Sequence, residues 1–157
     1  MGLDMYLKAE RYISGSEFGS AEEQATYAKG LETAGLTKKN VLDGSKSLSI
    51  CVTVGYWRKV NSIHNWFVRN VQAGIDECQK TRVSRESLQK LLEVCEEVIA
   101  DPSRAPELLP TAPGFFFGSS EINEYYLEGI KDTVRILKNA LGQDFKLFEN
   151  FTYQSSW

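Results

Sequence analysis

Residues 48–71 read Leu48-Ser49-Ile50-Cys51-Val52-Thr53-Val54-Gly55-Tyr56, followed at once by Trp57-Arg58-Lys59-Val60-Asn61-Ser62-Ile63-His64-Asn65-Trp66-Phe67-Val68-Arg69-Asn70-Val71. In the first part, apolar residues alternate with other residues at a period of two, which predicts a strand over Leu48–Tyr56. In the second part, apolar residues recur three or four positions apart, which predicts a helix over Trp57–Val71. The buried face of that helix is expected to carry Val60, Ile63, Phe67 and Val71. A strand followed directly by a helix sets the fold class as mixed.

Weaker patterns elsewhere complete an α+β prediction. Partial alternation predicts strands over Asp4–Ser14 and, at the other end of the chain, over Phe145–Tyr153. Residues Ala21–Leu31 fit a short helix limited by nearby glycines, and the polar stretch Thr37–Lys46 is expected to be a loop. The expected fold is a small antiparallel sheet of N-terminal, central and C-terminal strands, packed by about three main helices.

The second of these helices has the clearest start in the sequence. Ser84 is a good N-cap residue, and Val83 with Leu88 can form a hydrophobic staple around it. The buried stripe of the helix is expected to comprise Leu88, Leu91, Leu92, Cys95, Val98 and Ile99.

A third helix is expected from Ser119 or Ser120 to Leu141, with Gly142 at its C-cap. Its inward residues are expected to be Ile122, Tyr126, Ile130, Val134, Leu137 and Leu141. Before this helix lies a segment, 101–114, that holds all four prolines of the chain and is expected to be extended and stiff.

Composition places the chain among ordinary globular proteins. Of its 157 residues, 42% are hydrophobic and 25% are charged, which predicts one domain, 1–157, with a variable, loop-rich insertion at 14–45. No apolar run approaches the ~20 residues of a membrane span, and no secretory signal is recognisable. The three scattered cysteines are expected to be reduced thiols that mostly fill core space. We therefore expect a cytoplasmic protein with no membrane partner.

An acid-free stretch marks the expected binding site. Residues Gly44–Ile75 contain no Asp or Glu, although the net charge of the whole chain is -3, and they hold the only histidine and two of the three tryptophans. Indole can stack on a flat ring, Arg and Lys can neutralise phosphate or carboxylate, and Asn and His can form hydrogen bonds. The candidate ligand-binding residues are Trp57, Arg58, Lys59, Asn61, His64, Phe116, Ser119 and Trp157.

The last three candidates come from outside this stretch. Three consecutive phenylalanines, 115–117, cannot all face inward, so at least one is expected to be half-exposed or to line a cleft. Ser119 lies where the third helix is expected to begin, and the unpaired N–H groups of a helix terminus attract anions. Trp157 is expected to dock the tail into the same cleft, and self-association through the tail, giving a homo-oligomer, is the rival interpretation.

A plainer interpretation of the same residues stays open. Trp57 and Trp66 can be packing residues at the edge of the core, and His64 can be a boundary side chain with satisfied hydrogen bonds. Glu121 and Glu124 would repel a phosphate from the start of the third helix.

The sequence predicts no catalytic residues, no cofactor and no metal site. A single histidine excludes paired-His metal sites, and neither HExxH nor a Gly-x-Ser-x-Gly elbow is present. A nucleophile–base pair of Cys51 and His64 stays possible but unsupported. The acid-free stretch has only Lys46, Arg58, Lys59 and Arg69, too few cations for long duplex nucleic acid, but enough for a mononucleotide or a short oligonucleotide.

Several motifs give the chain a resemblance that covers most of its length. They are MGLDMYL at 1–7, VGYWRK at 54–59, IHNWFV at 63–68, LLPT at 108–111, GFFFG at 114–118 and YQSSW at 153–157. With them the chain resembles a group of small uncharacterised proteins of tailed bacteriophages, prophages and some bacteria. The resemblance implies a phage or prophage origin and expression in a bacterial cytoplasm, and it supplies no functional residues.

Two functions follow as hypotheses from different classes. The first is a non-enzymatic protein that binds a small anionic, nucleotide-like ligand in an aromatic and cationic cleft, so as to counter a host response. The second is an interaction module, an inhibitor or adaptor, that binds a host or phage protein through exposed aromatics such as Phe116, Trp66 and Trp157. The two differ in geometry, because a small-molecule site converges on a cavity and a protein interface is flatter.

Overall fold

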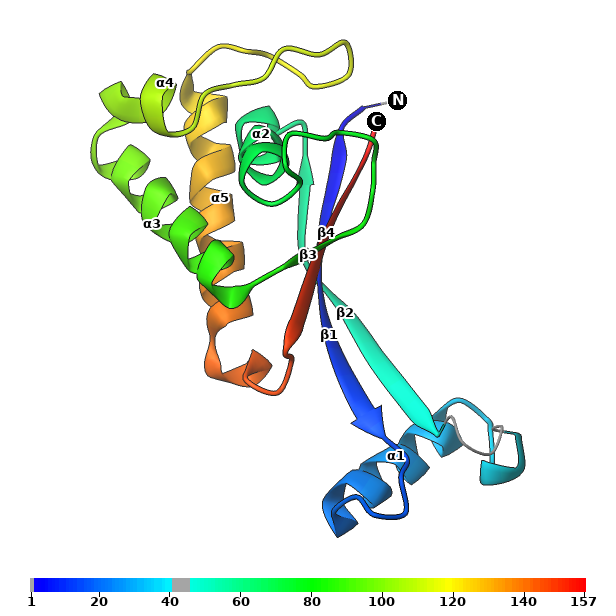
Figure 1. Cartoon of the computed structure of the whole chain (residues 1–157). Coiled ribbons are helices and arrows are strands. Elements are labelled where there is room, and N and C mark those ends of the chain that lie inside the picture. Colours follow the sequence, from blue (N-terminus) through cyan, green and yellow to red (C-terminus); the bar gives the residue numbers. More distant parts are fainter. Residues whose placement is uncertain (1, 41–45) are drawn as a thin grey trace. The chain divides into compact units, whose positions relative to one another are not determined.

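The computed structural model describes residues 2–40 and 46–157, and their strands form one four-stranded antiparallel sheet (Figure 1). The strands are β1 (Asp4–Ser14), β2 (Ser47–Arg58), β3 (Thr81–Val83) and β4 (Asn150–Ser156). Their order across the sheet is β2-β1-β4-β3, and β3 pairs antiparallel with β4 so that Val83 lies opposite Phe151. The helices are α1 (Ala21–Thr33), α2 (Asn61–Asn70), α3 (Arg85–Ala100), α4 (Ala105–Leu108) and α5 (Glu124–Leu141). The α+β class is therefore confirmed, with five α-helices in the described ranges instead of about three.

The chain divides into two compact units. Unit 1 comprises Met1–Ala9 with Val52–Trp157, and unit 2 comprises Glu10–Cys51. Unit 2 contains α1, the C-terminal part of β1 and the beginning of β2. The expected loop-rich insertion at 14–45 falls within unit 2, and its residues 41–45 lie outside the described part of the chain.

The core of unit 1 is built on alternation in β1. Met5, Leu7 and Ala9 of β1 are fully buried, as is Leu3 just before it, which follows the period of two for one face of a strand. In the same unit, α3 and α5 lie side by side, and their apolar stripes close over this core (Figure 1). Fully buried members from the helices and β4 are Ile63, Phe67, Leu88, Leu91, Cys95, Val98, Ile130, Leu137, Phe151 and Tyr153.

Several predicted elements are confirmed with little change. β1 has the predicted bounds, β2 extends the predicted strand at both ends, and α1 extends the predicted helix by two residues. Ser84 caps α3 by accepting a hydrogen bond from the Ser87 N–H, and Val83 and Leu88 of the predicted staple are both buried. Gly142 is the C-cap of α5, as predicted.

The predicted start of the helix at Trp57 is wrong. Trp57 and Arg58 belong to β2, and the N–H of Lys59 donates to the carbonyl of Leu3 next to β1. Lys59 has a φ of 58°, in the left-handed region, so the strand ends there and the chain turns before α2 begins at Asn61. The strand therefore continues two residues beyond the predicted end at Tyr56, and the helix begins four residues later than predicted.

The predicted start of the third helix is wrong as well. α5 begins at Glu124, because the side chain of Asn123 caps it by accepting from the Tyr126 N–H. Ser119 and Ser120 lie in the preceding loop, and Ile122, expected to face inward, is exposed.

The proline-rich segment is less extended than predicted. It contains a 3-10 turn, Pro102–Arg104, followed by α4, and Pro102 and Pro106 lie near the first positions of these turns, where a missing N–H costs nothing. A 3-10 turn, Lys38–Asn40, lies in the expected loop 37–46.

The C-terminal strand and the cysteines need correction too. The strand begins at Asn150, since Gln143–Phe145 form a 3-10 turn, and the three-residue β3 was not predicted because so short a segment carries no period. Of the cysteines, only Cys95 is buried, whereas Cys78 is half-buried and Cys51 is exposed. In the described ranges, no helix has the length and apolar character to cross a membrane.

Candidate ligand-binding cleft

A cleft in unit 1 collects five of the eight candidate residues. It has a volume of about 550 Å³ and lies between the end of β2, the start of α2, the loop 118–123 and the first half of α5. The candidates that line it are Trp57, Arg58, Lys59, Asn61 and Ser119. His64, Phe116 and Trp157 do not line it. The volume is in the range typical of sites for small molecules.

The charge of this cleft is mixed, not cationic as expected. Arg58 and Lys59 lie on the β2 side, and both are exposed. The loop and α5 add the carboxylates of Glu121, Glu128 and Asp132. The acid-free stretch of sequence therefore does not make an acid-free surface, because α5 and the loop before it supply carboxylates from elsewhere in the chain.

Trp57 takes a structural role. Its side chain is buried, and its indole N–H donates to the Thr133 hydroxyl at 2.9 Å inside the core. The ring also contacts Phe67, with 6.2 Å between the centroids. The buried indole therefore packs against α5 and has no exposed face on which a ligand ring can stack.

The side chain of Asn61 forms its hydrogen bonds within the protein. Its buried amide donates to the carbonyls of Phe117 and Ser119, at 3.1 and 2.8 Å, and its carbonyl accepts a longer bond from the Ala112 N–H. These bonds use most of the hydrogen-bonding capacity of the side chain. Asn61 therefore fixes the loop that forms one wall of the cleft and offers little to a ligand.

Ser119 lines the cleft but does not begin a helix. Its hydroxyl accepts from the Glu121 N–H, so the turn is closed locally. The predicted anion site at a helix N-terminus is wrong here, since the first N–H groups of α5 lie further along and are capped by Asn123.

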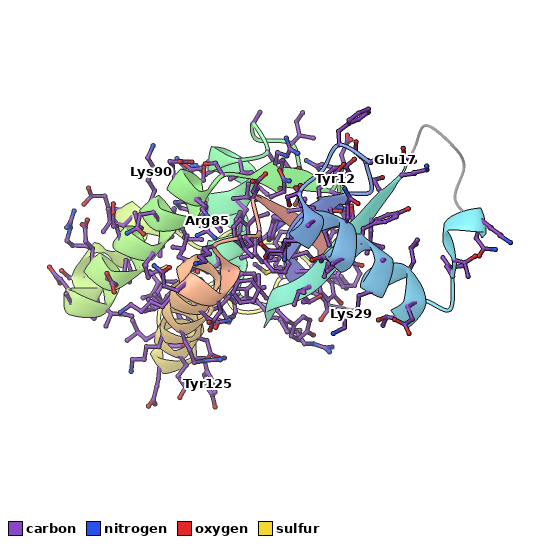
Figure 2. All side chains as sticks on the ribbon, turned by 90° about the horizontal axis from the view of Figure 1, so that it is seen from below. Tyr12, Glu17, Lys29, Arg85, Lys90 and Tyr125 are labelled. Atoms are coloured by element: carbon purple, nitrogen blue, oxygen red, sulfur yellow. The ribbon has the colours of Figure 1, made fainter. Side chains whose placement is uncertain are left out.

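Two tyrosines give the cleft an exposed aromatic surface. Tyr125 is 83% exposed on α5, and Figure 2 shows it projecting away from the ribbon. Tyr56 is about half exposed and donates to the carboxylate of Asp4, a hydrogen bond that raises the pKa of the phenol above its ordinary value. The sequence offered a signal for the α5 wall: Tyr125, Glu128 and Asp132 recur at helical spacing on one face.

Tyr126 lies next to them in the sequence but faces the core. Its hydroxyl donates to the Leu109 carbonyl at 2.8 Å, and burial raises the pKa of its phenol to about 12. It therefore stays a neutral hydrogen-bond donor at ordinary pH and ties α5 to the segment after α4.

His64 lies in a separate buried network. Its Nδ1 is 2.7 Å from the Tyr153 hydroxyl, and its Nε2 is 2.9 Å from Oδ2 of Asp76. A carboxylate accepts only, so Nε2–H donates to Asp76, and Nδ1 forms the second hydrogen bond of the ring, with the Tyr153 hydroxyl. Burial raises the pKa of Tyr153, which keeps that phenol protonated and able to donate. No ring nitrogen remains to activate Cys51, so the Cys51–His64 pair has no support.

Trp157 joins this network from the surface. Its indole N–H donates to Oδ1 of Asp76 at 3.2 Å, and its ring meets Phe117 edge to face with 6.0 Å between centroids. The tail therefore docks, as predicted, but against Asp76 and Phe117 and not in the cleft. Phe117 in turn contacts the His64 ring edge to face.

The three phenylalanines differ in exposure. Phe115 is 95% exposed, and Phe116 and Phe117 are half-buried, which confirms that at least one cannot face inward. The carbonyl of Phe116 accepts from the Leu3 N–H at 3.0 Å, so this segment is tied to the beginning of β1.

The described residues hold no cluster of three or more His, Cys, Asp or Glu side chains with metal-binding geometry. Comparisons of the chain with protein-family models, with curated proteins and with solved structures found no match.

Proposed function

We propose that the protein binds a small, nucleotide-like anionic ligand in the cleft of unit 1 without catalysing a reaction. The observation that supports this most directly is the pairing, around about 550 Å³, of Arg58 and Lys59 with the exposed ring of Tyr125. Two adjacent cations suit a phosphate group, to which Arg and Lys form short, charge-assisted hydrogen bonds.

The carboxylates narrow the class of ligand. A simple anion such as sulfate would be repelled by Glu121, Glu128 and Asp132. A nucleotide combines a phosphate with a base whose amino groups donate hydrogen bonds, and carboxylates accept such bonds. The base would stack on Tyr125, a contact worth roughly 1–3 kcal/mol. The phage or prophage origin implied by the sequence motifs favours a host nucleotide signal, which the protein would sequester.

A thermal-shift screen of the full chain tests this proposal. The panel holds nucleotides, cyclic and linear oligonucleotide signals, sugar phosphates and inorganic anions. A specific ligand at ~100 times its dissociation constant adds about 2.7 kcal/mol of stability, which a melt resolves.

Three variants then locate the ligand. Arg58→Gln and Tyr125→Ala are expected to weaken binding at least tenfold, as loss of one charge-assisted contact or one stacking ring implies. Arg69→Gln is the matched control, because Arg69 is exposed on α2 and does not line this cleft. Equal affinity of all four proteins, or no hit in the whole panel, would reject the proposal.

A second function, binding of a host or phage protein, has its own observation. Phe115, with 95% of its surface exposed, is an apolar side chain of the kind that anchors interfaces, and Tyr125 is exposed in the same unit. Trp66, expected as an anchor, is buried and cannot serve. Capture from bacterial lysate by the wild-type protein, lost with Phe115→Ser while cleft variants retain it, would favour this function over the first.

A further inference from the structure

We propose that unit 2 is a dimerisation module in which the outer face of α1 docks, antiparallel, against the same face of a second copy of the chain. This inference is independent of the cleft in unit 1. It rests on a groove in unit 2, on the spacing of two charges along α1 and on one fully exposed phenylalanine.

The groove has a volume of about 740 Å³ and is mainly apolar in lining. One side is α1, where small residues leave room for the close approach of another chain, and the other is the strand segment Leu48–Ile50. The small residues on α1 and its C-cap are Ala25, Thr26, Gly30, Thr33 and Ala34. Gly30 lies so close to Leu48 that a Cβ there would overlap that side chain. The contact between these two residues, which joins α1 to β2, forms the floor of the groove.

The opposite face of α1 already has its partners. Tyr27 and Leu31 are buried against Ile13, with Leu48 packed beside them. This core is small for a unit of about 40 residues, a size at which chains usually need additional stabilisation such as oligomerisation. The groove face is the apolar surface of α1 that unit 2 itself leaves uncovered.

The charges indicate that the occupant is a second copy. Glu22 and Lys29 both line the groove, seven residues or about 10 Å apart along the helix. Within the described residues neither side chain has an ion-pair partner, and Figure 2 shows Lys29 projecting from α1. A two-fold axis that crosses α1 between Ala25 and Thr26 places each Glu22 against Lys29 of the other copy, so both ion pairs form at once.

The same arrangement of the two copies predicts where Phe18 lies in the dimer. Phe18 is 100% exposed in the turn before α1, which is unusual for a large apolar side chain. The same axis places the turn before α1 of one copy at the C-terminal end of α1 of the other, near Thr33. Phe18 of one copy therefore reaches the groove of the other near Thr33, where the lining includes Ile50, itself partly exposed.

Sedimentation velocity of the full chain over a concentration series tests the proposal. The expected result is a reversible monomer–dimer equilibrium that Phe18→Ser shifts toward monomer. Glu22→Lys and Lys29→Glu should each weaken the dimer about tenfold or more, because each places like charges together at two symmetric positions.

The decisive measurement mixes the two charge variants. Glu22→Lys carries lysine at both positions and Lys29→Glu carries glutamate at both, so each homodimer is repelled while their heterodimer regains both ion pairs. Dimer recovery on mixing supports the proposal and cannot come from a contact within one chain. Circular dichroism of each variant checks that α1 still forms.

Three results would overturn it. The first is a wild-type chain that stays monomeric at all concentrations, which would leave the groove to a different partner. The second is a dimer that neither charge variant weakens, and the third is a dimer lost on Trp157→Ala instead, which would place the contact at the tail.

Discussion

Replacing Tyr153 with phenylalanine measures how much the hydrogen bond between Tyr153 and the buried His64 contributes to the free energy of unfolding. The substitution removes one hydroxyl and keeps the ring, so the stack of that ring on Phe67, with centroids 4.0 Å apart, is preserved. What is lost is the 2.7 Å hydrogen bond to Nδ1 of His64, whose side chain is only 1% exposed.

The magnitude follows from this burial. An average hydrogen bond contributes about 1 kcal/mol net, but a buried polar atom left without its partner adds a desolvation penalty, so the expected loss is about 1–3 kcal/mol of unfolding free energy. Water can replace the lost hydroxyl only if the site opens, since the volume freed is that of one oxygen atom.

Urea unfolding followed by circular dichroism measures this loss. The midpoint should fall while the slope of free energy against urea stays constant, because the surface exposed on unfolding hardly changes. Tyr125→Phe is the matched control: that hydroxyl is exposed, and its removal should change stability by less than about 0.5 kcal/mol. A loss for Tyr153→Phe no larger than the control would refute the reasoning that the hydrogen bond between Tyr153 and His64 is buried and stabilising.

Three further predictions test other contacts. Thr133→Val keeps the side-chain shape but removes the acceptor of the Trp57 indole, and should cost about 1–3 kcal/mol in urea unfolding. Burial raises the pKa of Cys95 and of Tyr126 to about 12, so between pH 9 and pH 12 the unfolded chain loses these protons first and the free energy of unfolding should fall as pH rises. In Tyr126→Phe, the free energy of unfolding plotted against pH should fall less steeply, by at most about 1.4 kcal/mol per pH unit. Gly118→Ala should destabilise by about 1 kcal/mol or more in thermal melts, because Gly118 has a φ of +89° and its new Cβ would lie 3.1 Å from Lys59 Cβ.

The sequence predicted best where local patterns and tertiary structure agree. β1 has the predicted bounds because Met5, Leu7, Ala9 and Ile13 alternate along it as buried residues, and α3 starts at its predicted cap because Ser84 supplies the bond directly. The pattern failed at Trp57, where an apolar residue satisfies strand and helix equally and only the pairing of Lys59 with Leu3 decides between them. It failed at Ser119 because Asn123 caps the helix instead.

The candidate site was predictable only in part. The cations Arg58 and Lys59 do line a cleft, as local composition suggested. The carboxylates opposite them come from α5 and the loop before it, and the hydrogen bonds of buried His64 depend on Asp76 and Tyr153, which are 12 and 89 positions away in the chain. Such convergence is a property of the tertiary fold, and no single stretch of sequence contains it.

The order of strands across the sheet has a consequence for how the chain is made. β1 and β4 are neighbours although they stand at opposite ends of the sequence, and Tyr153 on β4 completes both the Phe67 stack and the His64 network. At ribosomal rates, β4 is synthesised roughly 7–30 s after β1. Until then β1 has one edge unpaired, and the helices have an incomplete surface to pack on. Unit 1 can therefore reach its native state only after β4 has been synthesised and has paired with β1.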